Sequence, residues 1–312
     1  MLLCTSAESL YWFARQIERA DALSVALHTY EELGLDMPKS LAPQGGRLLS
    51  TLGLSWVTSP SSFSALKPSW VLDTRNPSSV LGALQAAREN LRTSRAFVPA
   101  QVWEALNAFY LELEGCSQSL SLSELLAALA RVALLCNQLR GQLAAGMTRD
   151  DAYTFLDIGW HVERADMMLR LIAVTSELVM PDEPRPFDDV RWAGLLKSVG
   201  AFEMYRRRHH GRLELGRILE FLLFSNNFPR SLAYCVARIE RRLSTLPRSE
   251  PALSGLSGIR LDASLLLGRR PVQSMLAQAT AALEPLAALN STLHQTYFAP
   301  QAELSPPLEL AG

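Results

Sequence analysis

The chain contains the same charged motif twice. Residues 17–21 read Ile-Glu-Arg-Ala-Asp and residues 162–166 read Val-Glu-Arg-Ala-Asp, so the two glutamates lie 145 positions apart. Apolar residues recur around each copy at three- and four-residue steps, which is the spacing of one face of an α-helix. We therefore predict two duplicated helices that carry carboxylates into a shared interior.

Each copy places an acidic pair on one face of its helix. Glu18 and Asp21 are three residues apart, as are Glu163 and Asp166, and side chains at this spacing are neighbours on a helix. A small residue, alanine in the first copy and glycine in the second, lies one turn before each glutamate. Small residues let a second helix approach closely, so we expect the glutamates to be partly desolvated.

Two interpretations of the motif remain open. In the first, its Glu and Arg side chains form a buried ion-pair network that holds two antiparallel helices in register, because a buried pair is costly to break. In the second, Glu18 and Glu163 have raised pKa values and act as general acid or base, or hold a cationic or amide-bearing ligand. A metal site is disfavoured, because di-iron bundles use Glu-x-x-His and both copies here have Asp at the fourth position. No other cofactor is indicated.

Helical periodicity extends along nearly every long segment and predicts an all-α fold, a single large bundle of about eight helices over residues 1–312. Residues 35–79 are rich in Gly and Pro but contain spaced Leu and Trp residues, so we predict a long packed connector. Residues 247–268 are predicted to form a loop. Besides the two motif helices, the predicted helices cover about 76–95, 99–115, 120–145, 189–205, 213–225, 229–246 and 271–298, the last one bent at Pro285.

Composition narrows the class of partner. The apolar content of 48% is ample for a core, and the net charge of −1 gives no general attraction to nucleic acid or anionic membranes. The four cysteines are scattered without Cys-x-x-Cys spacing, which fits free thiols in a reducing compartment. No segment has the pattern of a signal peptide or of a membrane span. We expect a cytoplasmic protein.

Three further stretches accompany the two motif copies. They are Asn76-Pro77-Ser78-Ser79 followed by Ala87-Arg88-Glu89-Asn90-x-Arg92-x-x-Arg95, then Trp103-x-x-x-Asn107, and Phe228-Pro229-Arg230-Ser231. Together with the repeat they resemble the bacterial alpha-E domain family over essentially the whole chain. The resemblance implies an all-helical fold and an association with circularly permuted ATP-grasp proteins and transglutaminase-like proteins. An association with these two kinds of protein implies a system that makes or trims amide bonds in peptides or small amino-acid conjugates.

The candidate site residues come from the resemblance and from the helical faces. The resemblance marks Glu18, Arg19, Glu163, Arg164, Arg88, Glu89, Asn90, Arg92 and Arg230. The motif faces and the neighbouring helix add Arg15, Asp21, Arg95 and Asp166. Arg88, Arg92 and Arg95 share one helical face, so we expect them to supply countercharges to the motif carboxylates. The position equivalent to Arg15 is Trp160 in the second copy, which predicts two chemically different halves.

Three functions are consistent with these patterns. The first is an accessory or substrate-binding component of an ATP-grasp-linked peptide or amide system, binding a peptide or amino-acid-like ligand. The second is an enzyme that uses Glu18 or Glu163 as acid or base in amide or peptide chemistry. The third is a homo-oligomeric helical scaffold. Geometry separates the first two hypotheses: glutamates that line an open cleft favour the enzyme, whereas sealed and fully paired glutamates disfavour it.

Overall fold

The computed structural model describes residues 3–36, 68–116, 120–178, 188–261 and 272–299. Within these ranges every regular element is helical and no strand occurs, which confirms the all-α prediction. The elements up to the second motif are α1 Cys4–Asp36, α3 Pro68–Leu72, α4 Val80–Ser94, α5 Ala100–Glu114, α6 Leu122–Gly146 and α7 Asp151–Leu178. Those after it are α8 Asp188–Ser198, α9 Phe202–Arg208, α10 Leu215–Phe224, α11 Leu232–Leu243, α12 Glu250–Gly255, α13 Val272–Ala281, α14 Leu283–Leu293 and a π turn His294–Phe298.

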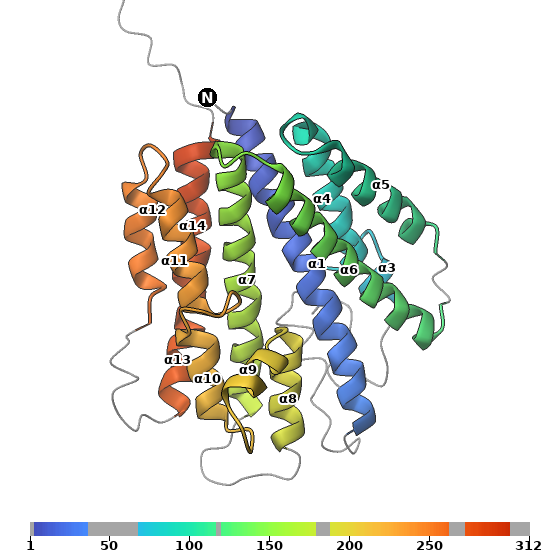
Figure 1. Ribbon diagram of the computed structural model, residues 1–312, viewed down its shortest axis with the longest axis vertical. Coiled ribbons are helices and arrows are strands. Elements are labelled where there is room, and N and C mark those ends of the chain that lie inside the picture. The colour runs from blue at the N-terminus through green and yellow to red at the C-terminus, as the bar shows by residue number, and fades with distance from the viewer. Residues whose placement is uncertain (1–2, 37–67, 117–119, 179–187, 262–271, 300–312) are drawn as a thin grey trace, which may run out of the picture.

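The two motif helices, α1 and α7, lie side by side at the centre of the bundle (Figure 1). Helices α3 to α6 pack on the side of α1, and α11 to α14 pack on the side of α7, while α8 to α10 cover one end. Both central helices are buried along most of their length, and the apolar side chains of all layers form one continuous core. The repeat therefore forms the axis around which the other helices assemble.

The central helices run parallel, and the expectation of an antiparallel pair is wrong. Arg15 and Arg19 of α1 contact Glu163 of α7, and Arg164 of α7 contacts Glu18 of α1. The sequence offset between contacting residues therefore stays close to the spacing of the repeat, which only a parallel pair can maintain. The parallel arrangement is possible because α3 to α6 lie between α1 and α7 in the sequence and return the chain to the end of the bundle at which α1 begins.

Gly159 sets how closely the two central helices approach. A Cβ atom at this position would lie 2.4 Å from the backbone oxygen of Tyr11 and 3.1 Å from the Cβ of Ala14. The first distance is far inside van der Waals contact, so any larger residue would push the helices apart. One turn further along, Glu163 and Glu18 reach across the same close contact.

Several predicted boundaries need correction. The helix expected at 189–205 is divided into α8 and α9 at Gly200, whose φ of +61° suits glycine and ends the first helix. The last helix is divided at Ala282 instead of bending at Pro285. The predicted loop at 247–268 is wrong for residues 250–258, which form α12 and a short 3-10 turn, while 262–268 lie outside the described residues. In the connector, α3 is well packed, with Trp70 to Leu72 buried; residues 37–67 also lie outside the described ranges.

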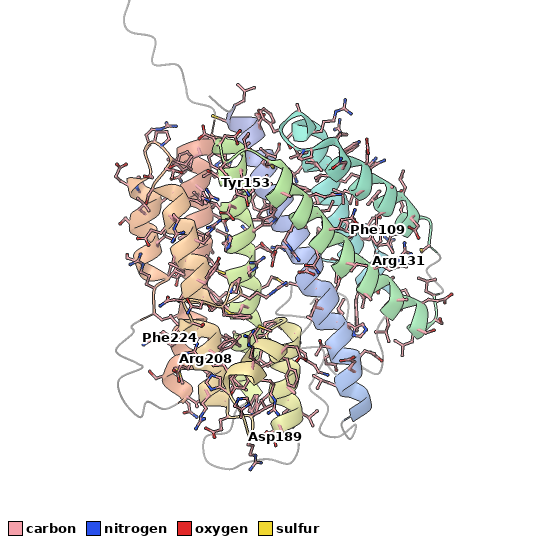
Figure 2. The ribbon with its side chains drawn as sticks, viewed as in Figure 1. Phe109, Arg131, Tyr153, Asp189, Arg208 and Phe224 are labelled. Carbon is pink, nitrogen blue, oxygen red and sulfur yellow. The ribbon has the colours of Figure 1, made fainter. Side chains whose placement is uncertain are left out.

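Helix α6 combines length with apolar composition. Among the described helices it alone is long and apolar enough to cross a membrane by these two criteria, which a core helix also meets. One face packs against α1 and α5, and Arg131 lies over the Phe109 ring of α5, its guanidinium carbon 5.3 Å from the ring centroid (Figure 2). Its other internal arginine, Arg140, turns toward the motif carboxylates. These contacts are those of a helix in the bundle.

The close contact at Gly159 predicts the effect of a single methyl group. Gly159→Ala should lower the free energy of unfolding by about 1–3 kcal/mol, because the backbone of α1 must move to make room. Gly141→Ala is the matched control, since a Cβ there meets no atom within 4 Å. The control should be neutral or should stabilise α6 by up to about 1 kcal/mol. Urea unfolding followed by circular dichroism measures both, and equal stabilities would contradict the assigned helix packing.

Candidate functional site

The two copies of the motif exchange their arginines. Arg19 of the first copy donates from Nε to Oε1 of Glu163 at 2.5 Å. Arg164 of the second copy donates from Nε and Nη2 to the two oxygens of Glu18 at 2.8 and 2.9 Å. Each glutamate is therefore neutralised by the arginine that follows the other glutamate in sequence. This reciprocal pairing follows from the parallel arrangement of α1 and α7.

A second arginine also binds Glu163, and it too comes from α1. Arg15, one turn before Arg19 on α1, donates from Nε to Oε2 of Glu163 at 2.6 Å. The same guanidinium donates to the side-chain oxygen of Asn290 on α14 at 2.7 Å, and the Tyr11 hydroxyl donates to that oxygen too. The Glu163 side of the motif is thus closed by α14.

Glu18 has different second partners. Arg140 of α6 donates from Nη1 to Glu18 and from Nη2 to Asp21, both at 2.8 Å. Arg230, in the turn before α11, donates to Asp21 at 3.1 Å and lies 3.6 Å from Glu18. These contacts join α6, α11 and both motif helices in one ion-pair network. The two halves differ chemically, as predicted: the second arginine of Glu163 comes from α1, whereas that of Glu18 comes from α6.

The motif glutamates are sealed and ionised. Their side chains are 1% and 0% exposed for Glu18 and Glu163 respectively. Burial on its own would raise the pKa of both carboxyls, but the facing guanidiniums outweigh it, Arg164 and Arg140 at Glu18 and Arg15 and Arg19 at Glu163. The net result is a lowered pKa for each. A raised pKa, which the acid–base hypothesis expects, is not what this environment produces.

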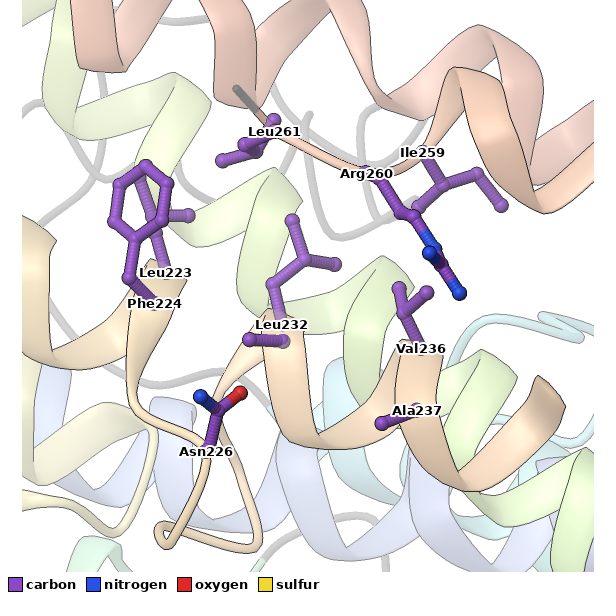
Figure 3. Close-up of a pocket in the computed structure, with 10 residues that line it drawn as sticks. Leu223, Phe224, Asn226, Leu232, Val236, Ala237, Ile259, Arg260 and Leu261 are labelled. Atoms are coloured by element: carbon purple, nitrogen blue, oxygen red, sulfur yellow. The ribbon is translucent and has the colours of Figure 1, made fainter. Parts of the chain in front are cut away.

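Little space remains beside the motif. A cavity of about 20 Å³ touches Glu18, Arg164 and Arg230, which is room for roughly one water molecule. A larger cavity of about 410 Å³ lies between α10, α11 and residues 259–261, with a mainly apolar lining and Asn226 and Arg260 as its polar groups (Figure 3). None of the predicted site residues lines it. Within the described ranges, no group of three or more His, Cys, Asp or Glu side chains is placed to hold a metal ion.

A second ionic cluster lies one to two turns before Glu163 on α7. Asp157 Oδ2 accepts from Nε of Arg238 at 2.9 Å and from Nε of Arg242 at 2.6 Å, both on α11. His161 Nδ1 lies 2.7 Å from the carbonyl oxygen of Asp157 and its ring faces Tyr234. Burial and the nearby Arg164 lower the pKa of His161 to about 4. The imidazole is therefore neutral at pH 7 in the folded protein.

The predicted site residues at positions 88–95 contact partners other than the motif carboxylates. Arg88 of α4 donates to Asn107 on α5 and pairs with Glu89, and Arg92 pairs with Glu89 as well. Arg95 is exposed, and the side chain of Asn90 donates to its own helix at Ala86. The prediction that Arg88, Arg92 and Arg95 are countercharges of the motif is therefore wrong. Asp166 pairs with Arg170 one turn later, as the spacing indicates.

Five residues of the two ionic clusters are missing from the sequence prediction: Arg140, Asn290, Asp157, Arg238 and Arg242. A signal for part of this set exists in the sequence, because Arg230, Tyr234, Arg238 and Arg242 follow one another at four-residue steps. That spacing places them on one flank of α11 and marks a functional or ionic face. Arg140 and Asn290 have no comparable signal, since within the described residues each is the single side chain of its helix that hydrogen-bonds to a motif carboxylate or to Arg15.

The reciprocal pairing predicts a large cost for removing one charge. Glu163→Gln leaves Arg15 and Arg19 without their carboxylate in a buried site, so the free energy of unfolding should fall by about 3–5 kcal/mol. Glu89→Gln is the matched control, because Glu89 also contacts two arginines but is 46% exposed. An exposed pair contributes only about 0–1 kcal/mol. If urea unfolding gave similar losses for both variants, the motif glutamates would not be buried as described.

The lowered pKa of His161 predicts a pH dependence of stability. Between the folded pKa of about 4 and the ordinary value of 6.5, the unfolded chain binds more protons than the folded protein, so stability falls as pH falls through this window. The loss attributable to this group should be roughly 2–3 kcal/mol. His161→Gln should flatten the dependence, and exposed His210→Gln should not. Unfolding titrations at several pH values measure it; identical slopes for the parent and His161→Gln would refute the assignment.

Comparison with known proteins agrees with the repeat. Residues 2–298 match a family described as "a predicted alpha-helical domain with a conserved ER motif", and the two Glu-Arg pairs of the repeat fit that description. An uncharacterized protein of Mycobacterium tuberculosis is 29% identical over 170 residues, which are 54% of this chain and 18% of the relative. An uncharacterized protein of Mycobacterium bovis is 27% identical over 187 residues, 58% of this chain and 21% of the relative.

The aligned residues are about a fifth of the length of these relatives, so the shared region forms a small part of much longer proteins. No solved structure matches the chain. The family match, in contrast, covers nearly all of it, including both motif helices and the helices that pack on them. This chain therefore belongs to the Alpha-E family.

Proposed function

We propose that this chain is a non-catalytic component of an ATP-grasp-linked system that makes or modifies peptide or amide bonds, and that it binds a partner protein or a peptide-like ligand. The observation that carries the proposal is the state of the motif. Glu18 and Glu163 are sealed from solvent, and each is bound by at least two arginines. This arrangement suits positioning and recognition.

The enzyme hypothesis draws less support from the same geometry. A general acid must carry a proton near neutral pH, whereas the pKa values of Glu18 and Glu163 are lowered by their guanidiniums. A general base needs access to the reacting group, and the cavity beside Glu18 has room for about one water molecule. Catalysis by these two side chains would require the network to open first.

The relatives support a role alongside other domains. In the mycobacterial proteins the aligned region is 18–21% of the polypeptide, so this type of helical unit occurs within larger chains. A unit that is covalently joined to further sequence in one protein can act with separate partners in another. The family resemblance suggests that such partners are ATP-grasp and transglutaminase-like proteins. We place the complex in the cytoplasm, which fits the four free cysteines.

Reconstitution tests this function. The chain, tagged and at micromolar concentration, should co-purify with an ATP-grasp protein from the same organism and should increase that protein's ATP-dependent product formation, followed by mass spectrometry. An unrelated ATP-grasp protein is the control for the partner. Glu112→Gln serves as the control for the chain, because Glu112 is exposed, pairs with Arg131 and is not among the candidate site residues.

Three results would contradict the proposal. The first is no association with any genomic neighbour, and the second is product formation by the chain alone. The third is self-association as the chain's one detectable interaction, which would favour the scaffold hypothesis. One further result would favour catalysis by the motif. This is an activity of the isolated chain that a Glu163→Gln variant loses although the variant still folds stably.

A further inference from the structure

A layer of partly exposed arginine side chains covers the carboxylates on one side of α1 and α7. Three carboxylates lie beneath it, Glu18, Asp21 and Asp157, whose side chains are at most 4% exposed. The arginine side chains that bind them are 14–28% exposed and come from three helices and one turn: Arg140, Arg164, Arg230, Arg238 and Arg242. We call these five residues the arginine face. An approaching ligand meets positive groups, while the negative groups are covered.

The arginine face carries more positive than negative charge. Its five guanidiniums are balanced by three carboxylates, so this cluster of described residues has an excess of two positive charges. His161 adds none, because its pKa is lowered to about 4. The chain as a whole has a net charge of −1, so the excess is local. A local positive excess on a nearly neutral protein attracts anions to one place on the surface.

The geometry of α11 arranges this charge in a row. Tyr234, Arg238 and Arg242 follow one another at four-residue steps and face His161, Asp157 and Tyr153 of α7 in turn. Arg230 continues the row at the start of α11, next to Glu18 and Asp21. The row extends over roughly three helical turns. A ligand that used all of it would need several anionic groups.

Arg238 and Arg242 can donate further hydrogen bonds from their guanidinium N–H groups. Within the described residues, Arg238 and Arg242 each donate only from Nε, and both bonds go to the same oxygen of Asp157. A guanidinium has five N–H donors, so the Nη1 and Nη2 groups of both residues remain for a ligand. Asp157 holds the two forks next to each other and reduces the entropy that a ligand must pay to order them. Adjacent, fixed guanidiniums match the two oxygens of a carboxylate.

We propose that the arginine face binds an acidic segment of the partner protein of the function proposed above, on which this inference rests. Carboxylates at intervals along the segment pair with Arg238 and Arg242 at one end and with Arg230 at the other. A long nucleic acid fits less well, because the chain has no overall positive charge and the row is short.

Fluorescence anisotropy tests the proposal with the full-length chain. The probe is a fluorescein-labelled peptide of about twelve residues with glutamate at every second position, because residues two apart in an extended chain are about 6.6 Å apart, close to the roughly 6 Å step between successive arginines on α11. Its affinity should fall steeply when NaCl is raised from about 50 mM to about 500 mM, because screening weakens exposed charge pairs. A peptide with glutamine at the same positions should bind at least about tenfold more weakly.

Variants locate the site. Arg238→Gln should weaken binding of the glutamate peptide by about tenfold, while Arg242 still neutralises Asp157 and keeps the fold. Arg238→Lys should restore the charge but only part of the affinity, because lysine lacks the planar fork. Arg131→Gln is the matched control, since Arg131 is an exposed arginine of α6 that pairs with Glu112 of α5 and lies apart from Tyr153 (Figure 2). Thermal unfolding of each variant checks that it is folded.

Several outcomes would overturn the inference. These are equal affinity for the glutamate and glutamine peptides, an equal effect of Arg238→Gln and Arg131→Gln, or tighter binding of a labelled oligonucleotide of similar length. Inorganic phosphate that displaces the peptide at equal concentration would also overturn it, because the site would then recognise single anions. Since the assay contains no partner protein, a failure here leaves co-purification intact, and a failed co-purification leaves this result intact.

Discussion

The structure depends on the exchange of guanidiniums between Glu18 and Glu163. Because each glutamate is neutralised by the arginine of the other copy, neither motif can be buried unless both helices are in place and in register. Buried ion pairs are weak sources of net stability, but a wrong register would leave a charge unpaired in the interior at a cost of several kcal/mol, on the order of 3–5. The repeat thus specifies one alignment of α1 and α7, and Gly159 provides the close approach that this alignment needs.

The shared core of the motif has two unlike surroundings. On the Glu163 side, Arg15 fills the second position and is fixed by Asn290 of α14, so that flank is covered by the C-terminal helices. The equivalent position in the second copy is Trp160, which cannot supply a charge, and Arg140 and Arg230 take that role from other elements. Duplication therefore accounts for the central pair, whereas later divergence of the two halves accounts for the difference between a covered flank and a basic, solvent-facing one.

The sequence predicts the central helices and their contents well, because a repeated pattern with helical spacing determines which residues share a face. It does not determine the direction of the pair or which helix covers that face. The antiparallel expectation and the assignment of Arg88, Arg92 and Arg95 fail for this reason. Helical periodicity shows which residues share a face of α4 but not which element that face contacts, and Arg88 contacts Asn107 on α5. Arg140 is the converse case, since it is one of two internal arginines on a largely apolar helix, and its role depends on where α6 crosses α1.

The buried carboxylates hold the arginine side chains above them in fixed positions. A free arginine side chain loses roughly 2 kcal/mol of rotamer entropy when a ligand orders it. Arg238 and Arg242 are already held by Asp157, and Arg140 and Arg230 by Asp21. The carboxylates then lower the entropic cost of binding an anion, although they also reduce the positive potential that attracts it. Because five guanidiniums stand over three carboxylates, the attraction persists after this compensation. A motif that looks like a pair of acid–base groups in sequence can therefore serve recognition, by fixing the groups that meet the ligand.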